Sequence, residues 1–364
     1  MIRFAFRNDR RCIEVFAVQP QPLIRGTGGG QYTTPRAPED TVKKSDLPIA
    51  IGIMIAATML GSAQAQTLRS SPKQQCSLAV VSRLVATGTR VCDSTVVENM
   101  ARSGHAFEQN QLGIASILAI GPDYSQREAL AWFEKAARRG YAPAQVNLAV
   151  MYINGWGTTV NSGAALNWLH AAADQGFARA YFNLGILYLE GKGVRQDNAA
   201  AFQWFQKGAL GGDASAQTDL GYMYDGGLGC AKNLGTAVAW YRKAAEGGNP
   251  LAQNNLADMY LRGDGVTQND AAAFSWFQKA AAQGHTGARI KLGYLCSEGR
   301  GTPKDLEAAY SSIIAASMAG DPRGNDLLHS LEKSLSPEQI MRARRRASSL
   351  SQTEPQLSAG MFAQ

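Results

Sequence analysis

One interval governs the middle of this chain, because the same residue types return every 36 residues over much of its length. The residues in this register are the tryptophans Trp132, Trp168, Trp204, Trp240 and Trp276, the leucines Leu148, Leu184, Leu220, Leu256 and Leu292, and the tyrosines Tyr152, Tyr188, Tyr224 and Tyr260. A fixed period of this length indicates a solenoid, in which each unit stacks only on its neighbours. We therefore expect a row of similar stacked units.

The pattern inside each unit predicts a helical hairpin, as residues 178–212 illustrate. Leu184 and Tyr188 fall on one stripe of a first helix, and a Gly-x-Gly turn follows, where glycine takes positive φ without a Cβ clash. A second helix, capped by Asp197, carries Trp204 on its packing face. We expect the recurring tryptophans, leucines and tyrosines to form the core. The recurring turn glycines are Gly155, Gly157, Gly191, Gly193, Gly227, Gly229, Gly263, Gly265, Gly299 and Gly301.

The pattern "A.A..NLG.LY..GKGV..D...A..W..KAA..G", which residues 178–212 follow except for Gly208 in place of one alanine, resembles the Sel1-like repeat, a relative of the tetratricopeptide repeat. The resemblance covers residues 104–319 as six units. It implies an all-α fold, a right-handed α-α superhelix of helical hairpins. We expect a linker and a degenerate capping unit over residues 66–103, capping helices over 320–350 and a disordered tail over 351–364. The first and sixth units depart from the pattern, with Ser116 and Cys296 at the tyrosine position, as terminal solenoid units often do.

The N-terminal region predicts export. Residues 1–41 are rich in proline and glycine and lack apolar periodicity, so we expect disorder there. Residues 42–65 resemble a secretory signal peptide, with two lysines, an apolar run and a small-x-small site for cleavage between Ala65 and Gln66. An uncleaved anchor or a buried helix is the alternative, although a run of about 15 residues is short for a membrane span. Because no methionine lies between Met1 and Met54, we expect translation to start at Val42.

The charge of the chain argues against a nucleic-acid partner. The formal net charge is +7, but the repeat region is close to neutral and four arginines gather in one tail, between residues 342 and 346. Binding to nucleic acid needs a basic face, which this distribution does not provide.

No pattern in the sequence predicts catalysis. His105 and His285 hold the same turn position, just after a boundary glycine, and His170 and His329 complete no ligand set. Motifs for zinc, phosphate or a nucleophilic serine are missing. We expect no catalytic residue, no metal and no cofactor.

The cysteines leave two questions open. In an exported chain Cys76 and Cys92 could form a disulfide. Two buried thiols are the alternative, because a helical hairpin would hold these residues about 15 Å apart. The resemblance also includes a branch of secreted, cysteine-rich repeat proteins associated with β-lactamase and penicillin binding, which looks to have a cysteine pair in every repeat. Here the repeats contain only Cys230 and Cys296, in different positions.

The function that the resemblance implies is protein–protein interaction. We expect a non-catalytic scaffold of the bacterial cell envelope, periplasmic or secreted, without membrane insertion after cleavage. The alternative is a secreted hydrolase of the cysteine-containing branch. The partner is expected on the concave surface, on the stripe of the first helices opposite the packing residues, unless the N-terminal segment or neighbouring helices cover that stripe. The candidate residues are Val146, Val150, Phe182, Ile186, Tyr222, Asp258 and Tyr294.

Overall fold

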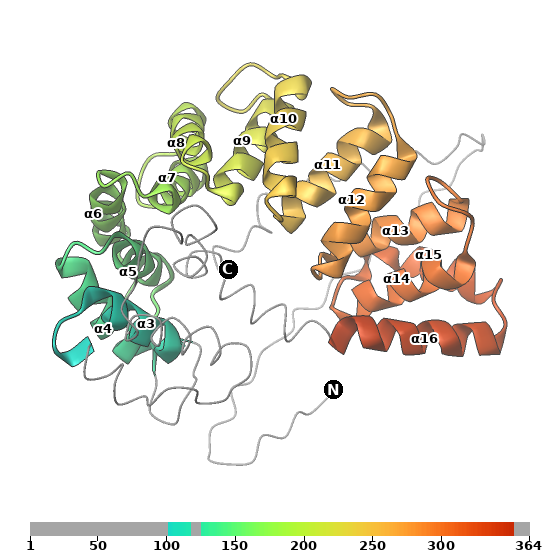
Figure 1. Cartoon of the computed structure of the whole chain (residues 1–364), viewed down its shortest axis with the longest axis horizontal. Coiled ribbons are helices and arrows are strands. Elements are labelled where there is room, and N and C mark those ends of the chain that lie inside the picture. Colours follow the sequence, from blue (N-terminus) through green and yellow to red (C-terminus); the bar gives the residue numbers. More distant parts are fainter. Residues whose placement is uncertain (1–100, 118–124, 353–364) are drawn as a thin grey trace, which may run out of the picture. The chain divides into compact units, whose positions relative to one another are not determined.

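The computed structural model describes residues 101–117 and 125–352 of the chain. In this part of the chain all regular structure is helical, and α3 to α14 form six hairpins that follow one another in chain order (Figure 1). These helices are α3 (Ala106–Ile117), α4 (Gln126–Arg138), α5 (Ala142–Asn154), α6 (Ser162–Ala173), α7 (Ala178–Glu190), α8 (Asn198–Leu210), α9 (Ala214–Gly226), α10 (Leu234–Glu246), α11 (Pro250–Arg262), α12 (Asp270–Ala282), α13 (Thr286–Glu298) and α14 (Leu306–Met318). The predicted all-α solenoid is confirmed.

Stacking joins each helix to the next one along the chain. Both helices of a hairpin pack on each other, and the second helix also packs on the first helix of the following hairpin. In addition, α7 contacts both α5 and α9 directly. This direct contact between first helices identifies their side of the array as the inner side.

Side chains cap the helices where the sequence predicts caps. Asn161, Asp197, Asn233, Asn269 and Asp305 each accept a hydrogen bond from a backbone N–H in the first turn of a second helix. These bonds satisfy donors that a helix start leaves without partners inside the helix.

His285 caps α13 from its turn position. Its Nδ1 accepts a hydrogen bond from the N–H of Ala288 at 3.1 Å, which requires that nitrogen to be unprotonated. Burial, together with the cations of Lys291 and Arg323, lowers the pKa of His285 to about 4, against the opposing effect of Asp321. The neutral imidazole is therefore the capping form at neutral pH.

All ten predicted turn glycines have positive φ, between 67° and 75°. The second glycine of each turn also lies against the start of the preceding second helix. A Cβ atom on Gly229 would stand 2.1 Å from the carbonyl oxygen of Asn198, and one on Gly193 would stand 2.2 Å from the Cβ of Ser162. Each of these glycines therefore serves both the turn and the contact between neighbouring hairpins.

The core lies one residue beyond each tryptophan. The residues that follow the tryptophans are at most 1% exposed: Phe133, Leu169, Phe205, Tyr241 and Phe277. A glycine of the first helix makes room for several of these side chains, since a Cβ on Gly185 would lie 2.6 Å from the Phe205 ring. The recurring leucines are buried, as predicted, and the recurring tyrosines are half-buried against the same clusters.

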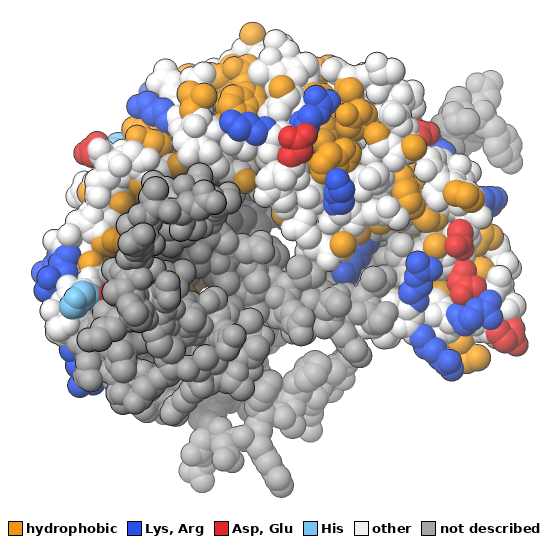
Figure 2. Space-filling view, viewed as in Figure 1, with side chains coloured by type: hydrophobic (Ala, Val, Ile, Leu, Met, Phe, Trp, Pro, Cys, Tyr) orange, Lys and Arg blue, Asp and Glu red, His pale blue; other side chains and the backbone are white. Residues whose placement is uncertain are grey.

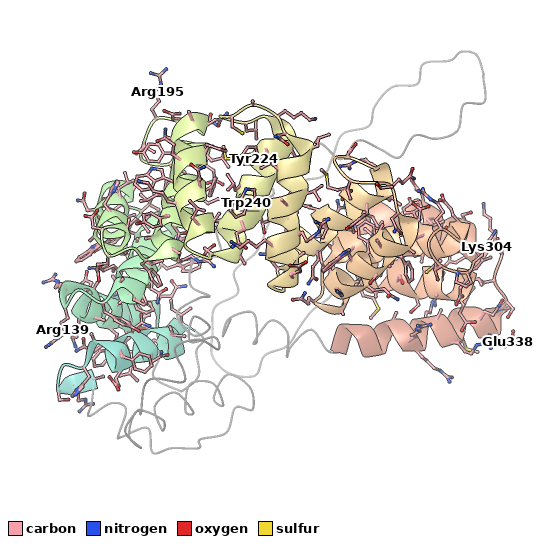
Figure 3. All side chains as sticks on the ribbon, turned by 45° about the horizontal axis from the view of Figure 1, so that its top comes forward. Arg139, Arg195, Tyr224, Trp240, Lys304 and Glu338 are labelled. Carbon is pink, nitrogen blue, oxygen red and sulfur yellow. The ribbon has the colours of Figure 1, made fainter. Side chains whose placement is uncertain are left out.

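The recurring tryptophans are half-buried, as the recurring tyrosines are, and the residues that follow them are among the largest fully buried side chains. Four of them, Trp168, Trp204, Trp240 and Trp276, pack at the edges of the hydrophobic clusters. Trp204 contacts a cluster that joins Leu184 and Leu187 of its own hairpin to the preceding hairpin. Figure 3 shows Trp240 and Tyr224 within the array, whereas Arg195 on a Gly-x-Gly turn points away from it. In four hairpins a lysine lies over the exposed side of the indole, as Lys207 does over Trp204 at 4.5 Å from the ring centroid.

A polar side chain fastens each first helix to the preceding helix. The side chain at one register position donates a hydrogen bond to the backbone carbonyl eight residues earlier, as Gln217 does to Ala209. The residues at this position are Gln109, Gln145, Tyr181, Gln217, Gln253 and Arg289. The bond satisfies a carbonyl in the last turn of a helix, which lacks a partner inside that helix.

Two helices cap the C-terminal end, α15 (Asn325–Glu332) and α16 (Pro337–Gln352), after a single 3₁₀ turn at Pro322–Gly324. The longer helix, α16, packs on α14, where Tyr310 is fully buried and donates a hydrogen bond to Glu332 at 2.9 Å. This helix runs two residues past the expected end of the cap.

Several expectations fall outside the described residues. They are the signal peptide with its Ala65–Gln66 cleavage site, the translation start, the pairing of Cys76 with Cys92, most of the N-terminal capping unit and the tail after residue 352.

Candidate binding surface

The seven candidate residues lie on the first helices of five successive hairpins, but three of them are buried. Val146 and Val150 are each 1% exposed and Phe182 is 6% exposed, so the prediction that they are free to face a groove is wrong. Val146 belongs to a core cluster. The Phe182 ring packs against Phe205, with 5.9 Å between centroids, and the Arg179 guanidinium covers it at 4.9 Å.

The remaining candidates are accessible on the inner side of the array. Tyr222 on α9 and Tyr294 on α13 are each 40% exposed, and Ile186 on α7 is half-buried. Between the two tyrosines, Asp258 on α11 accepts a charge-assisted hydrogen bond from Lys291 on α13. We define the inner-face surface as Ile186, Asp219, Tyr222, Asn254, Asp258, Lys291 and Tyr294.

A buried ion pair borders this surface between α7 and α9. Arg179 Nε lies 2.8 Å from Asp213 Oδ2, and both side chains are almost fully buried. Asp213 also caps α9 by accepting from the N–H of Ala216, and Arg179 donates to the hydroxyl of Ser215 at 3.3 Å. A buried pair with these additional hydrogen bonds fixes the geometry of the two helices, and removing one partner would leave an unpaired buried charge.

Asp219 carries the most perturbed carboxyl group of the surface. Burial, with the carboxylates of Asp213 and Glu190 and against the opposing effect of Arg179, raises the pKa of Asp219 to about 7. Asp219 makes no ion pair with any residue in the described ranges. At neutral pH the group is therefore close to its midpoint between the neutral and the charged form.

Tyr241 and the asparagines of α11 complete the polar part of the surface. Burial, together with the carboxylates of Asp225 and Asp219, raises the pKa of Tyr241 well above its usual value of 10, while a hydrogen bond with Asn255 lowers it. The neighbouring Asn254 is 7% exposed and donates to Asn255 Oδ1 at 3.2 Å. Its own Oδ1 is buried and has no hydrogen-bond partner.

The face of the array that looks along the shortest axis has a mixed character. On the face drawn in Figure 2, hydrophobic side chains gather over α8 to α12, with lysines and arginines scattered between them. The arginine-rich helix α16 is partly neutralised, because Arg342 pairs with Glu307 at 2.9 Å and Arg344 with Glu332 at 3.5 Å.

The described residues offer no metal centre: no group of three His, Cys, Asp or Glu side chains in this part of the chain is close enough to hold an ion. Cys230 and Cys296 are free thiols in different positions of their hairpins, and burial raises the pKa of both. Among the helices of the described ranges, none has the length and apolar character to cross a membrane.

Comparison with known proteins gives one consistent family. The model of the Sel1 repeat matches six times, at residues 109–141, 142–177, 178–213, 214–249, 250–285 and 287–311, which together exceed half of the chain. The search of the curated proteins finds no match.

A solved structure shows the same fold, and a second one is similar in sequence. A Sel1 repeat protein from Oxalobacter formigenes is 27% identical over 68% of this chain and 97% of its own, with a TM-score of 0.57. A protective antigen present in uropathogenic Escherichia coli strains is 27% identical over 74% of this chain and 64% of its own, with a TM-score of 0.44. With six matched repeats and six helical hairpins in the same positions, the chain belongs to the Sel1 repeat family.

Proposed function

We propose that the protein is a non-catalytic scaffold that binds a partner protein on the inner-face surface. The observation that carries this proposal is the pair of tyrosines, Tyr222 and Tyr294, which are each 40% exposed at the same register position. Tyrosine is enriched at the centres of protein interfaces, because it combines a large apolar ring with a polar tip. Membership of the Sel1 repeat family supports the scaffold role, since such repeats typically mediate protein interactions.

The proposal can be tested with two truncated tyrosines. We expect the double variant Tyr222→Ala, Tyr294→Ala to keep its circular dichroism and melting temperature, because substitutions at accessible positions typically change stability by about 0.5 kcal/mol or less. The variant should lose partner proteins that the unchanged protein captures from envelope extract, each confirmed afterwards with the purified partner.

The matched control is Leu210→Ala on α8, which removes a more exposed apolar side chain, 70% accessible, from a second helix. This control should keep every partner. If the double tyrosine variant captures the same partners, the inner-face surface is not the binding surface. The arginines of α16 are then the next candidate.

We also propose that the scaffold works in the bacterial periplasm or outside the cell. The support is the pattern of residues 42–65, with its two lysines, apolar run and small-x-small site. The intact mass of the protein recovered from the cell envelope should fit residues 66–364. Retention of residues 47–61 in that protein would favour a membrane anchor instead.

The hydrolase alternative has no supporting observation. The cysteine pair expected in every repeat of such a protein is missing from the described repeats, which contain Cys230 and Cys296 as free thiols. Hydrolysis of a chromogenic β-lactam by the pure protein would reopen it.

A further inference from the structure

Asp219 carries a negative charge that none of its equivalents in the other hairpins carries. The residues at this register position are Gln111, Asn147, Asn183, Asp219, Asn255 and Lys291. Four of the six are neutral amides, and asparagine has the same shape as aspartate. Since the neighbouring hairpins pack with asparagine here, packing alone does not require a carboxylate at Asp219.

Asp219 has no ion-pair partner in the described part of the chain, because Arg179, the cation that acts on it, is paired with Asp213. Neighbouring carboxylates have ion-pair partners: Asp213 pairs with Arg179, Glu190 with Lys192 and Asp258 with Lys291. Asp219 has none, and it stands three residues before Tyr222, on the same side of α9. A cation that reached Asp219 would therefore also lie beside an exposed aromatic ring.

A buried acceptor atom on α11 is independent evidence that a partner binds at this surface. Asn254 is more than nine-tenths buried, and its Oδ1 has no hydrogen-bond partner among the residues that the structure describes. Its Nδ2 is turned toward Asn255 Oδ1 and, at 3.5 Å, toward the carboxylate of Asp258. Asn255 is bonded in turn to Tyr241, whose pKa the carboxylate of Asp219 helps to raise. A buried acceptor without a partner costs free energy, and a donor N–H from a bound segment would remove that cost.

We propose that the inner-face surface recognises a basic segment of its partner, in which a lysine or arginine side chain pairs with Asp219 and a donor N–H reaches Asn254 Oδ1. This inference rests on the proposed function and adds the chemical class of the partner. Removing the Asp219 charge would leave the hairpins intact, because burial penalises the charged form of this group and asparagine occupies the equivalent positions.

The protonation of Asp219 makes the affinity for a cation depend on pH, and a purely structural role of Asp219 would not produce this dependence. The groups that face Asp219 are Asp213, Glu190 and Arg179 on one side and Tyr241 on the other. Tyr241 stays protonated near neutral pH, because its pKa is raised well above 10. Since the pKa of Asp219 is about 7, the fraction of the carboxylate form rises between pH 6 and pH 8. Affinity for a cation should rise over the same range.

The experiment uses the full chain and three fluorescein-labelled ten-residue peptides of one glycine–serine background. The first peptide carries three arginines, the second three glutamines and the third three glutamates. Fluorescence polarisation should show that the arginine peptide binds about tenfold more tightly than the glutamine peptide, a factor of the size that one close charge pair provides. The glutamate peptide should bind more weakly still.

The matched variants are Asp219→Asn and Asp174→Asn, which remove one negative charge each. Asp174 lies exposed at the end of α6, away from the inner-face surface. Asp219→Asn should lose the preference for arginine and the rise in affinity from pH 6 to pH 8, whereas Asp174→Asn should keep both.

Equal binding of the arginine peptide by the Asp219→Asn variant, or tighter binding of the glutamate or glutamine peptide, overturns the inference. Failure of the arginine peptide to bind overturns it as well. These outcomes are distinct from failure of the scaffold proposal, which is decided by whether the double tyrosine variant loses its native partners.

Discussion

Replacement of Gly229 by alanine is expected to destabilise the fold by about 3 kcal/mol or more, because two penalties combine at this residue. The backbone has a φ of 68°, which L-residues with a side chain rarely adopt. The added Cβ would also stand 2.1 Å from the carbonyl oxygen of Asn198, at the start of α8. Backbone atoms cannot rotate away as a side chain can, so the two hairpins would have to separate. Urea unfolding followed by circular dichroism measures the loss.

Gly212→Ala is the matched control, because it repeats the strain without the clash. Gly212 has a φ of 89°, and a Cβ there would meet no atom within 4 Å. Its replacement should cost about 1 kcal/mol, as expected for strain alone. If both variants lose the same stability, the close contact between Gly229 and the preceding hairpin adds no cost beyond the backbone strain, which contradicts the prediction.

These two glycines illustrate which features of the fold can be predicted from the sequence and which cannot. The repeat, the hairpins, the helix caps and the positive φ of the turn glycines are predictable, because each depends on residues close together in the chain. Gly229 and Gly212 have equal status in the sequence pattern. Only the stacking of neighbouring hairpins distinguishes them, since it brings Asn198 against Gly229 and leaves Gly212 open.

The error about the binding stripe has the same physical origin. A stripe opposite one packing face is exposed on a helix that has one neighbour. A first helix in this array has three kinds of neighbour: its own hairpin partner, the preceding second helix and the adjacent first helices. Phe182 is therefore buried although it lies opposite Leu184, whereas Tyr222 and Tyr294 reach the surface. Among the described residues, Asn254 Oδ1 has no hydrogen-bond partner and Asp219 has no ion pair, and both follow from the same packing, which the sequence does not show.

The position of Gln217 and its equivalents, whose side chains donate to the backbone carbonyl eight residues earlier, could have been identified from the sequence. Glutamine occupies this register position in four of six hairpins, which the 36-residue period makes visible. Its role depends on the turn between helices, because the side chain reaches a carbonyl eight residues earlier only when the chain reverses between them. The 36-residue period thus identifies the position, but its role in joining two helices can be recognised only from the fold.

The second large effect is expected at Phe205, where alanine should destabilise the fold by roughly 3–5 kcal/mol, as removal of a fully buried aromatic ring does. Phe205 is 0% exposed and packs against Phe182 and the backbone at Gly185. Truncation would leave a cavity that the rigid helix at Gly185 cannot fill. The measurement is again the urea midpoint of the purified variant.

Trp204→Ala is the informative comparison, because the sequence pattern places the larger effect at the tryptophan. The Trp204 ring is half-buried, stacks on Tyr181 with 5.9 Å between centroids and is covered outside by Lys207. Part of its area already contacts water or a mobile lysine stem, so its removal exposes less new apolar surface and leaves no closed cavity. We expect a loss of roughly 1–2 kcal/mol for this variant. A larger loss for Trp204→Ala than for Phe205→Ala would show that stacking between hairpins, which the tryptophan edge provides, stabilises the array more than the core inside each hairpin does.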